Sequence, residues 1–129
     1  MVKLIDFDYD LARLLLDRVE NKKGTITYEE CAEILSKETG EKVYAHGSLR
    51  MPLARICELC YELELPLISA FVILKKDFTG SKTGSGFYTK ACELKPEYKA
   101  VTPIEAWKTE LSLIRKCKDW SSLHTYLSI

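Results

Sequence analysis

The sequence has no excess of charge of either sign and no long apolar run. Nineteen basic side chains balance nineteen acidic ones over 129 residues, and the sequence pI is near 6.7. Proteins that coat DNA are usually strongly basic, so this balance excludes that class and leaves nucleic-acid binding only through a local asymmetry of charge. The apolar runs fall short of a membrane span, which predicts a soluble protein with no membrane partner.

Repeats, low-complexity tracts and linkers are also missing, and no signal peptide is recognisable. A hydrophobic composition of 47% is enough for one domain with its own core, which we expect to span residues 1–129. Histidine is scarce, and no Ser/His/Asp or paired-carboxylate spacing rises above chance. The chain is therefore predicted to have no catalytic centre and no cofactor.

Cysteine is present, but in an odd number and always within an apolar pattern, at Cys31, Cys57, Cys60, Cys92 and Cys117. This usage favours reduced thiols and a cytoplasmic location. Cys57 and Cys60 form a C-x-x-C pair inside a predicted helix, whereas a redox pair would open the helix. Since His46 and His124 are isolated, a zinc site lacks its further ligands. We therefore predict packing roles for the thiols and no bound metal.

Helical periodicity predicts three helices in the first half of the chain, over residues 5–20, 28–39 and 49–64. The second helix has the clearest start, because Thr27 and Glu30 form a capping box. Gly40 can end the same helix.

The second half changes character after Pro66. The continuous apolar run LPLISAFVIL predicts a strand covered on both faces, over about 67–76, and GFYTKACEL alternates like a returning strand over about 86–94. A helix is predicted over 103–118, with Thr102 as its cap, followed by one short last turn. The expected fold is an α+β winged-helix-like domain with three helices, a β-hairpin and a C-terminal helix.

This order of elements is that of a winged helix, in which the second and third helices form a helix-turn-helix and the hairpin is the wing. The stretch GTITYEECAEIL also resembles the start of the winged-helix domain in the alkylguanine-DNA alkyltransferase-like family, with matches at Gly24, Thr27, Tyr28 and Ala32. The resemblance covers about residues 24–87 in order of elements. It implies a DNA-binding fold in which Arg50 is a loose counterpart of the family's base-flipping arginine.

The chain departs from that family where its chemistry lies. The family's nucleophilic cysteine belongs to a P-C-H-R motif, but here Leu67 follows Pro66, and LPLISAFVI contains neither cysteine nor histidine. Alkyl transfer is therefore not implied. The pattern LPLISAFVILKKDFTGSKTGSGF is also similar to a segment of small uncharacterised bacterial and phage proteins, which implies a shared fold and no named activity.

The densest group of basic residues surrounds KKDFTGSKTGSGFY, residues 75–88. Lysines gather there against one acid, Asp77, at Lys75, Lys76, Lys82 and Lys90. The glycines lead into a predicted strand instead of a helix, so the loop is not a Walker motif. A plain turn explains the glycines alone, whereas a basic hairpin tip that lies along phosphates also explains the lysines.

The predicted third helix carries Arg50 and Arg55 in its first half, where a recognition helix meets base edges. Its second half is acidic, with Glu58, Glu62 and Glu64, so only an end-on approach to a duplex is compatible with these charges. A solvated helix face explains the same pattern.

Two functions therefore remain open. The first is a non-catalytic nucleic-acid-binding module, with double-stranded DNA as the expected partner, that uses Arg50, Arg55 and the lysines of the hairpin. The second is a protein-interaction module, such as a phage or mobile-element factor that binds and inhibits a host protein. The neutral charge favours the second, and the order of elements and the local basicity favour the first.

Overall fold

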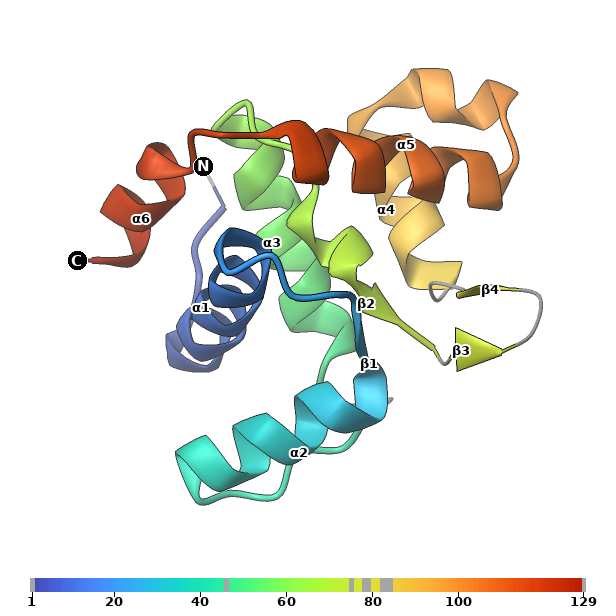
Figure 1. The fold of residues 1–129 in the computed structure, drawn as a ribbon. Coiled ribbons are helices and arrows are strands. Elements are labelled where there is room, and N and C mark those ends of the chain that lie inside the picture. The colour runs from blue at the N-terminus through green and yellow to red at the C-terminus, as the bar shows by residue number, and fades with distance from the viewer. Residues whose placement is uncertain (1, 46, 75, 78–79, 82–84, 129) are drawn as a thin grey trace.

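The structure is a computed structural model that describes residues 2–45, 47–74, 76–77, 80–81 and 85–128; for 76–77, 80–81 and 85 it describes the backbone. In chain order the elements are α1 (Asp6–Glu20), β1 (Ile26–Thr27), α2 (Tyr28–Thr39), α3 (Arg50–Glu62), η1 (Ile68–Phe71), β2 (Val72–Ile73), β3 (Lys76–Asp77), β4 (Gly80–Ser81), α4 (Ser85–Leu94), η2 (Pro96–Ala100), α5 (Pro103–Lys116) and α6 (Ser121–Leu127). Helices dominate, and small two-stranded sheets make the fold compatible with the α+β class (Figure 1).

The predicted helices of the first half are confirmed as α1, α2 and α3, and the predicted C-terminal helix is α5. The Thr27 hydroxyl accepts a hydrogen bond from the Glu30 amide at 3.1 Å, so the capping box begins α2 as expected. The Thr102 hydroxyl caps α5 in the same way, 3.2 Å from the Glu105 amide. The predicted last turn is the short helix α6, which packs against α1.

The predicted strand over 67–76 is wrong for most of its length. Residues 68–71 form the 3-10 helix η1. Among the described residues of this range, the strand positions are β2, paired in parallel with β1 through Ile26 and Val72, and Lys76 at the start of β3. The apolar run is continuous because η1 is enclosed by α1, α3 and α5. A short buried helix and a buried strand have the same apolar sequence, so periodicity could not separate them.

The predicted returning strand over 86–94 is also wrong, since these residues lie in α4. Phe87 and Ala91 are four residues apart, as are Tyr88 and Cys92, which places each pair on one face of a helix. The antiparallel hairpin is confined to β3 and β4 among the described residues, with Lys76 opposite Ser81. The predicted wing is therefore much shorter than expected.

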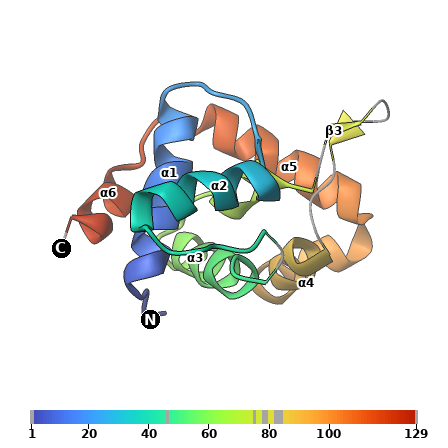
Figure 2. The ribbon, with the colours of Figure 1, turned by 90° about the horizontal axis from the view of Figure 1, so that it is seen from below.

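Helix α3 lies between α1 and α4 (Figures 1 and 2). It packs against α1 on one side, against α4 on the other and against η1, whereas α2 packs mainly against β1 and β2. In the predicted helix-turn-helix, α2 would cover α3 directly and leave one long face of α3 open. Here the exposed residues of α3 are at its two ends, Arg50 and Met51 at the start and Tyr61 and Glu62 at the finish.

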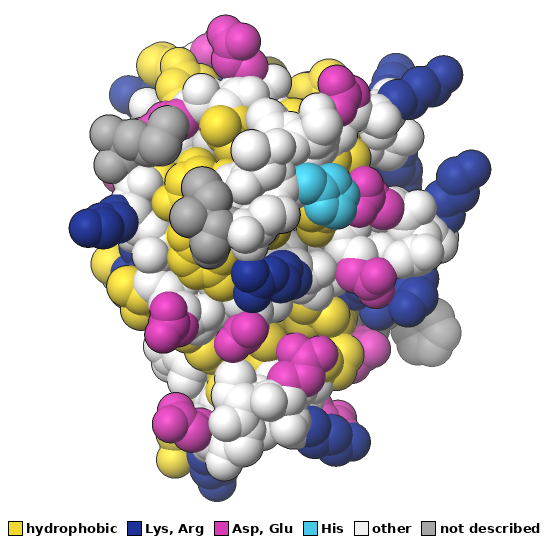
Figure 3. Space-filling view, turned by 90° about the vertical axis from the view of Figure 1, so that its left-hand side faces the viewer, with side chains coloured by type: hydrophobic (Ala, Val, Ile, Leu, Met, Phe, Trp, Pro, Cys, Tyr) yellow, Lys and Arg dark blue, Asp and Glu magenta, His cyan; other side chains and the backbone are white. Residues whose placement is uncertain are grey.

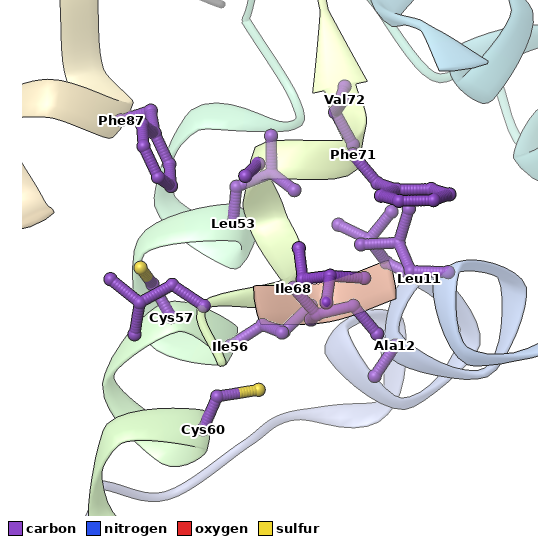
Figure 4. Packing of buried hydrophobic residues seen from close by; sticks show 14 of the residues in the cluster. Leu11, Ala12, Leu53, Ile56, Cys57, Cys60, Ile68, Phe71, Val72 and Phe87 are labelled. Carbon is purple, nitrogen blue, oxygen red and sulfur yellow. The ribbon is translucent and has the colours of Figure 1, made fainter. Parts of the chain in front are cut away.

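The core forms where η1 meets these helices (Figure 4). Ile68 lies between α1 and α3, Phe71 lies over Leu11 of α1, and Phe87 of α4 points toward α3 near Cys57. All five of these side chains are buried. The first turn of α4 is thus anchored to α3 by an aromatic ring.

Helix α5 holds η1 in place through buried polar groups. Glu110 has no exposed surface; its carboxylate accepts hydrogen bonds from the Leu67 amide and the Lys95 ammonium, each at 2.8 Å, and from the Tyr98 hydroxyl. The Trp107 indole N–H donates to the carbonyl of Ala70 at 2.8 Å. These bonds satisfy backbone groups of an irregular buried segment that would otherwise be costly to bury.

All five cysteines are free thiols, and Cys117 is the one that is only partly buried. The predicted packing role is confirmed for the four buried thiols. Burial raises the pKa of Cys31 and of Cys60 to about 12, so neither is a ready nucleophile. In the described part of the chain, no helix is long and apolar enough to cross a membrane.

Candidate functional site

A cavity of about 500 Å³ opens between the first turns of α3 and α4. Its lining combines apolar side chains with a few charged and polar groups: Tyr28, Arg50, Met51, Leu53, Ala54, Cys57, Ser69, Leu74, Gly86, Phe87, Thr89, Lys90 and Glu93. Its size and mixed lining are those of a ligand-binding cleft. It is the natural candidate for a functional site.

The start of α3 forms one wall of the cavity. Leu49 and Pro52 are buried and fix the first turn, which leaves Arg50 and Met51 exposed beside the cavity. No acidic residue lies in this turn, and no side chain caps it. A cation at a helix N-terminus opposes the helix dipole, so Arg50 does not stabilise α3. Among the described residues Arg50 also has no ion-pair partner.

The start of α4 forms the opposite wall. Gly86 and Phe87 line the cavity, and Phe87 is held against α3 by the core. The first amides of a helix have no partner within the helix and carry partial positive charge. Both helices at the cavity thus present their positive ends to the same region.

The lysine-rich segment begins and ends at this cavity. Leu74 and Gly86 both line it, and the residues that connect them include Lys75, Lys76 and Lys82. Lys75 and Lys82 lie outside the described residues, and only the backbone of Lys76 is described, in β3. Hairpin β3–β4 lies at the edge of the molecule, beside the start of α4 (Figure 1).

Lys90 lines the cavity from α4, but its charge is partly balanced. Its ammonium lies 3.4 Å from the Glu58 carboxylate and 3.3 Å from that of Glu93. Burial alone would lower the pKa of Lys90, but the hydrogen bonds and charges of Glu93 and Glu58 outweigh it and raise the pKa. The structure places Lys90 at the site as predicted, as one member of an ion-pair group.

Arg55 does not join the cavity. Its Nε lies 2.6 Å from Asp8 Oδ2 and its Nη2 lies 2.9 Å from Asp8 Oδ1, and the Asp8 side chain is fully buried. The hydrogen bonds to Asp8 raise the pKa of the guanidinium. Arg55 thus forms a structural ion pair that joins α3 to α1, and its contact with base edges stays a prediction.

Cys57 lines the cavity but offers no chemistry there. Burial, followed by the charge of Cys60, raises its pKa far above the ordinary value for a thiol. Within the described ranges, no group of three or more His, Cys, Asp or Glu side chains could hold a metal ion. His46 lies outside those ranges.

Sequence reasoning missed the apolar part of the lining. Met51, Leu74 and Phe87 come from three separate segments, and nothing in their local patterns shows that they meet. The one available signal was the Gly86-Phe87 pair at the end of the lysine-rich stretch.

Elsewhere the surface is of mixed charge. On the face that Figure 3 shows, acidic, basic and apolar side chains are interspersed without a broad field of one sign. Comparisons of the chain with protein-family models, with curated proteins and with solved structures find no match. The function is therefore argued from the cavity and from the charges around it.

Proposed function

We propose that the chain is a non-catalytic nucleic-acid-binding module, with double-stranded DNA as its partner. The observation that carries the proposal is that Arg50 and both ends of the lysine-rich segment border one cavity. Arg50, Lys75, Lys76 and Lys82 then act together on one stretch of phosphates. Lys90 borders the same site, and Arg55 contributes by holding α3 in place.

The position of Arg50 supports an end-on approach. A phosphate at the start of α3 would be attracted by the guanidinium of Arg50, by the uncapped amides of the helix and by the helix dipole. The acidic second half of α3 opposes this approach little, because Glu58 is paired with Lys90 and Glu62 is the last residue of the helix, at the end away from Arg50.

A winged-helix relationship is part of the proposal. It is supported by the order of α1, α2 and α3 followed by the hairpin β3–β4, which would be a short wing. Helix α4 then replaces the second long strand of the wing and carries the far wall of the cavity. The five free thiols favour the cytoplasm as the compartment.

Retention on duplex DNA as a function of salt tests this function. With four cations on the phosphates, the logarithm of the binding constant should fall with the logarithm of salt concentration with a slope of roughly −3 to −4. A triple variant with Lys75, Lys76 and Lys82 changed to Glu should lose binding at low salt, and Arg50→Ala should weaken it further. Fluorescence anisotropy of a labelled duplex of about 20 base pairs measures both effects.

A matched control separates local charge from net charge. Lys3, Lys37 and Lys42 are exposed and lie outside the cavity lining, so changing them to Glu alters the net charge equally. This control should keep most of the binding. Equal losses in the two triple variants, or a parent protein that binds neither DNA nor RNA at low salt, would refute the proposal.

A protein-interaction module is the second candidate, and the apolar part of the cavity favours it. Met51 is 61% exposed and Leu74 is 37% exposed, and both line the cavity together with Phe87. Such a cleft can hold an apolar anchor residue of a host protein. If Met51→Ser abolishes capture of one protein from nuclease-treated lysate while DNA binding is absent, this function replaces the first.

A further inference from the structure

A second hollow lies along α5 and shares no lining residue with the cavity between α3 and α4. It has a volume of about 580 Å³, and all its lining residues belong to α5: Trp107, Lys108, Leu111, Ser112, Arg115 and Lys116. None of these residues was assigned a binding role from the sequence.

The floor of this hollow is apolar. Trp107 is 7% exposed and Leu111 is 6% exposed, one turn further along the helix. The polar atom of the Trp107 ring is already satisfied, since its N–H donates to the Ala70 carbonyl. Little of either side chain is therefore left for a partner. The apolar surface of the hollow is a narrow strip of indole and leucine carbon beside the methylene groups of Lys108, Arg115 and Lys116.

The rim of the hollow is cationic. Lys108, Arg115 and Lys116 are exposed, and within the described ranges their side chains form no ion pair or hydrogen bond. Neither acid of α5 forms an ion pair with them, although Glu105 lies three residues before Lys108. Glu110 is buried and bound to Lys95, and Glu105 lies in the first turn, at the N-terminal end.

Helix stability explains only part of this arrangement. Arg115 and Lys116 occupy the last turn of α5, where cations complement the helix dipole. Lys108 lies near the middle of the helix and gains nothing from the dipole. Nor does the dipole account for an apolar floor between the cations.

We propose that this face of α5 is a docking surface for an acidic amphipathic helix of a protein partner. Lys108 and Arg115 are seven residues apart, about 10.5 Å along the helix axis, which matches carboxylates two turns apart on a facing helix. Apolar residues between those carboxylates would cover Trp107 and Leu111. Phosphates and sugars would gain nothing from that floor, so charge and apolar surface together favour a peptide over nucleic acid.

A synthetic peptide of about five helical turns, with leucines on one face and glutamates beside them, is the probe. We expect it to bind the parent protein and to shift the backbone amide resonances of residues 104–116 in a nitrogen–proton correlation spectrum. A peptide of the same composition, scrambled so that its leucines no longer share a face, should bind more weakly by roughly tenfold.

Two variants test the surface itself. Changing Lys108, Arg115 and Lys116 to Glu should weaken the binding of the peptide by roughly tenfold or more, because three attractive charge contacts become repulsive. Ser112→Glu adds one negative charge in the middle of the half-buried hollow without altering the core, and it should weaken the peptide as well. The variant with Lys3, Lys37 and Lys42 changed to Glu has the same net charge as the first and should bind like the parent.

Three results would overturn the docking surface. Equal binding of the ordered and scrambled peptides would show that the apolar floor is not used. Peptide-induced shifts confined to residues outside α5 would place the contact elsewhere. A labelled DNA duplex that displaces the peptide and shifts the same α5 resonances would make this face a nucleic-acid surface. All three are independent of the fate of Arg50 and the lysine-rich segment.

Discussion

Arg50 and Arg55 show how the same residue type takes different roles on one helix. Arg55 meets the buried carboxylate of Asp8 through two hydrogen bonds, whereas Arg50 is exposed beside the cavity. Asp8 also accepts a hydrogen bond from the Ile5 amide at 3.1 Å, so its carboxylate fixes the start of α1 as well. The charge of Arg55 is committed to the fold, and the charge of Arg50 remains available to a partner.

Substituting the two arginines separates these roles. Arg55→Ala leaves the Asp8 charge buried and unpaired, so we expect the free energy of unfolding to fall by about 3 kcal/mol. Arg50→Ala should change it by less than about 0.5 kcal/mol, as is usual for exposed positions. Urea denaturation followed by circular dichroism measures both. Similar losses in the two variants would contradict the assignment of Arg55 to the fold.

The Tyr98 hydroxyl gives the fold a dependence on alkaline pH. Burial and the hydrogen bond to Glu110 raise the pKa of Tyr98 well above its ordinary value. Because the pKa is raised, the folded state holds the hydroxyl proton more tightly than the unfolded chain does, and this difference stabilises the fold. The stabilisation is fully present below about pH 10, where Tyr98 titrates in the unfolded chain, and it is lost progressively at higher pH. Thermal melts from pH 8 to roughly pH 11 should show this decline.

Tyr98→Phe is the control for that titration. The variant should be less stable at neutral pH, because it leaves one Glu110 hydrogen bond unmade, but its melting temperature should fall less steeply above about pH 10. Parallel curves for the two proteins would show that Tyr98 is not the responsible group. Tyr9 and Tyr88, whose pKa values are also raised, remain in both proteins and cancel in the comparison.

Helix α6 is attached to α1 by an apolar contact and by polar ones. Leu123 is fully buried, whereas the His124 ring lies 2.7 Å from the Glu20 carboxylate on the surface. We expect Leu123→Ala to cost about 3 kcal/mol and His124→Ala less than about 1 kcal/mol. The smaller effect should disappear in high salt, because exposed ion pairs are screened. Unfolding curves at low and high ionic strength check both values.

The elements that the sequence predicted well are those whose signals are local. The capping boxes at Thr27 and Thr102 each use residues three positions apart, and α2 and α5 begin where these boxes indicate. The segments 68–71 and 86–94 were predicted wrongly, because their conformation depends on neighbours far along the chain. Glu110 accepts a hydrogen bond from the Leu67 amide, 43 residues away in the chain. A short stretch of sequence around either residue does not contain the other.

The same limit applies to the candidate site. Arg50 could be placed on an exposed helix start because Leu49 and Leu53, four residues apart, mark the buried side locally. The sequence alone could not show that Arg55 has a different role from Arg50, because its partner Asp8 lies 47 residues away in the chain. The sequence did not predict the hollow on α5 although its residues are close together in the chain. Its cations are spaced along a helix and have the pattern of an ordinary solvated face.

In the whole molecule, zero net charge conceals two separate regions of positive charge. One is the proposed nucleic-acid site, formed by Arg50 and the lysine-rich segment that begins and ends at the cavity, and the other lies along α5. The acids that bring the net charge to zero are spread over the rest of the chain. Net charge alone therefore says little about what such a protein binds, because a partner responds to the local field within about a Debye length.

If the two regions are separate sites, their substitutions should act independently. Changing Lys75, Lys76 and Lys82 to Glu should weaken the binding of duplex DNA and leave the binding of the acidic peptide unchanged. Changing Lys108, Arg115 and Lys116 to Glu should weaken the binding of the peptide and leave that of DNA unchanged. A combined variant should show both losses, additive in free energy to within about 0.5 kcal/mol, because distant sites with no shared partners do not couple. Titrations of each ligand in the presence of saturating amounts of the other measure this directly. Mutual displacement, or a combined loss far from the sum, would show that the two regions form one continuous surface for a single partner.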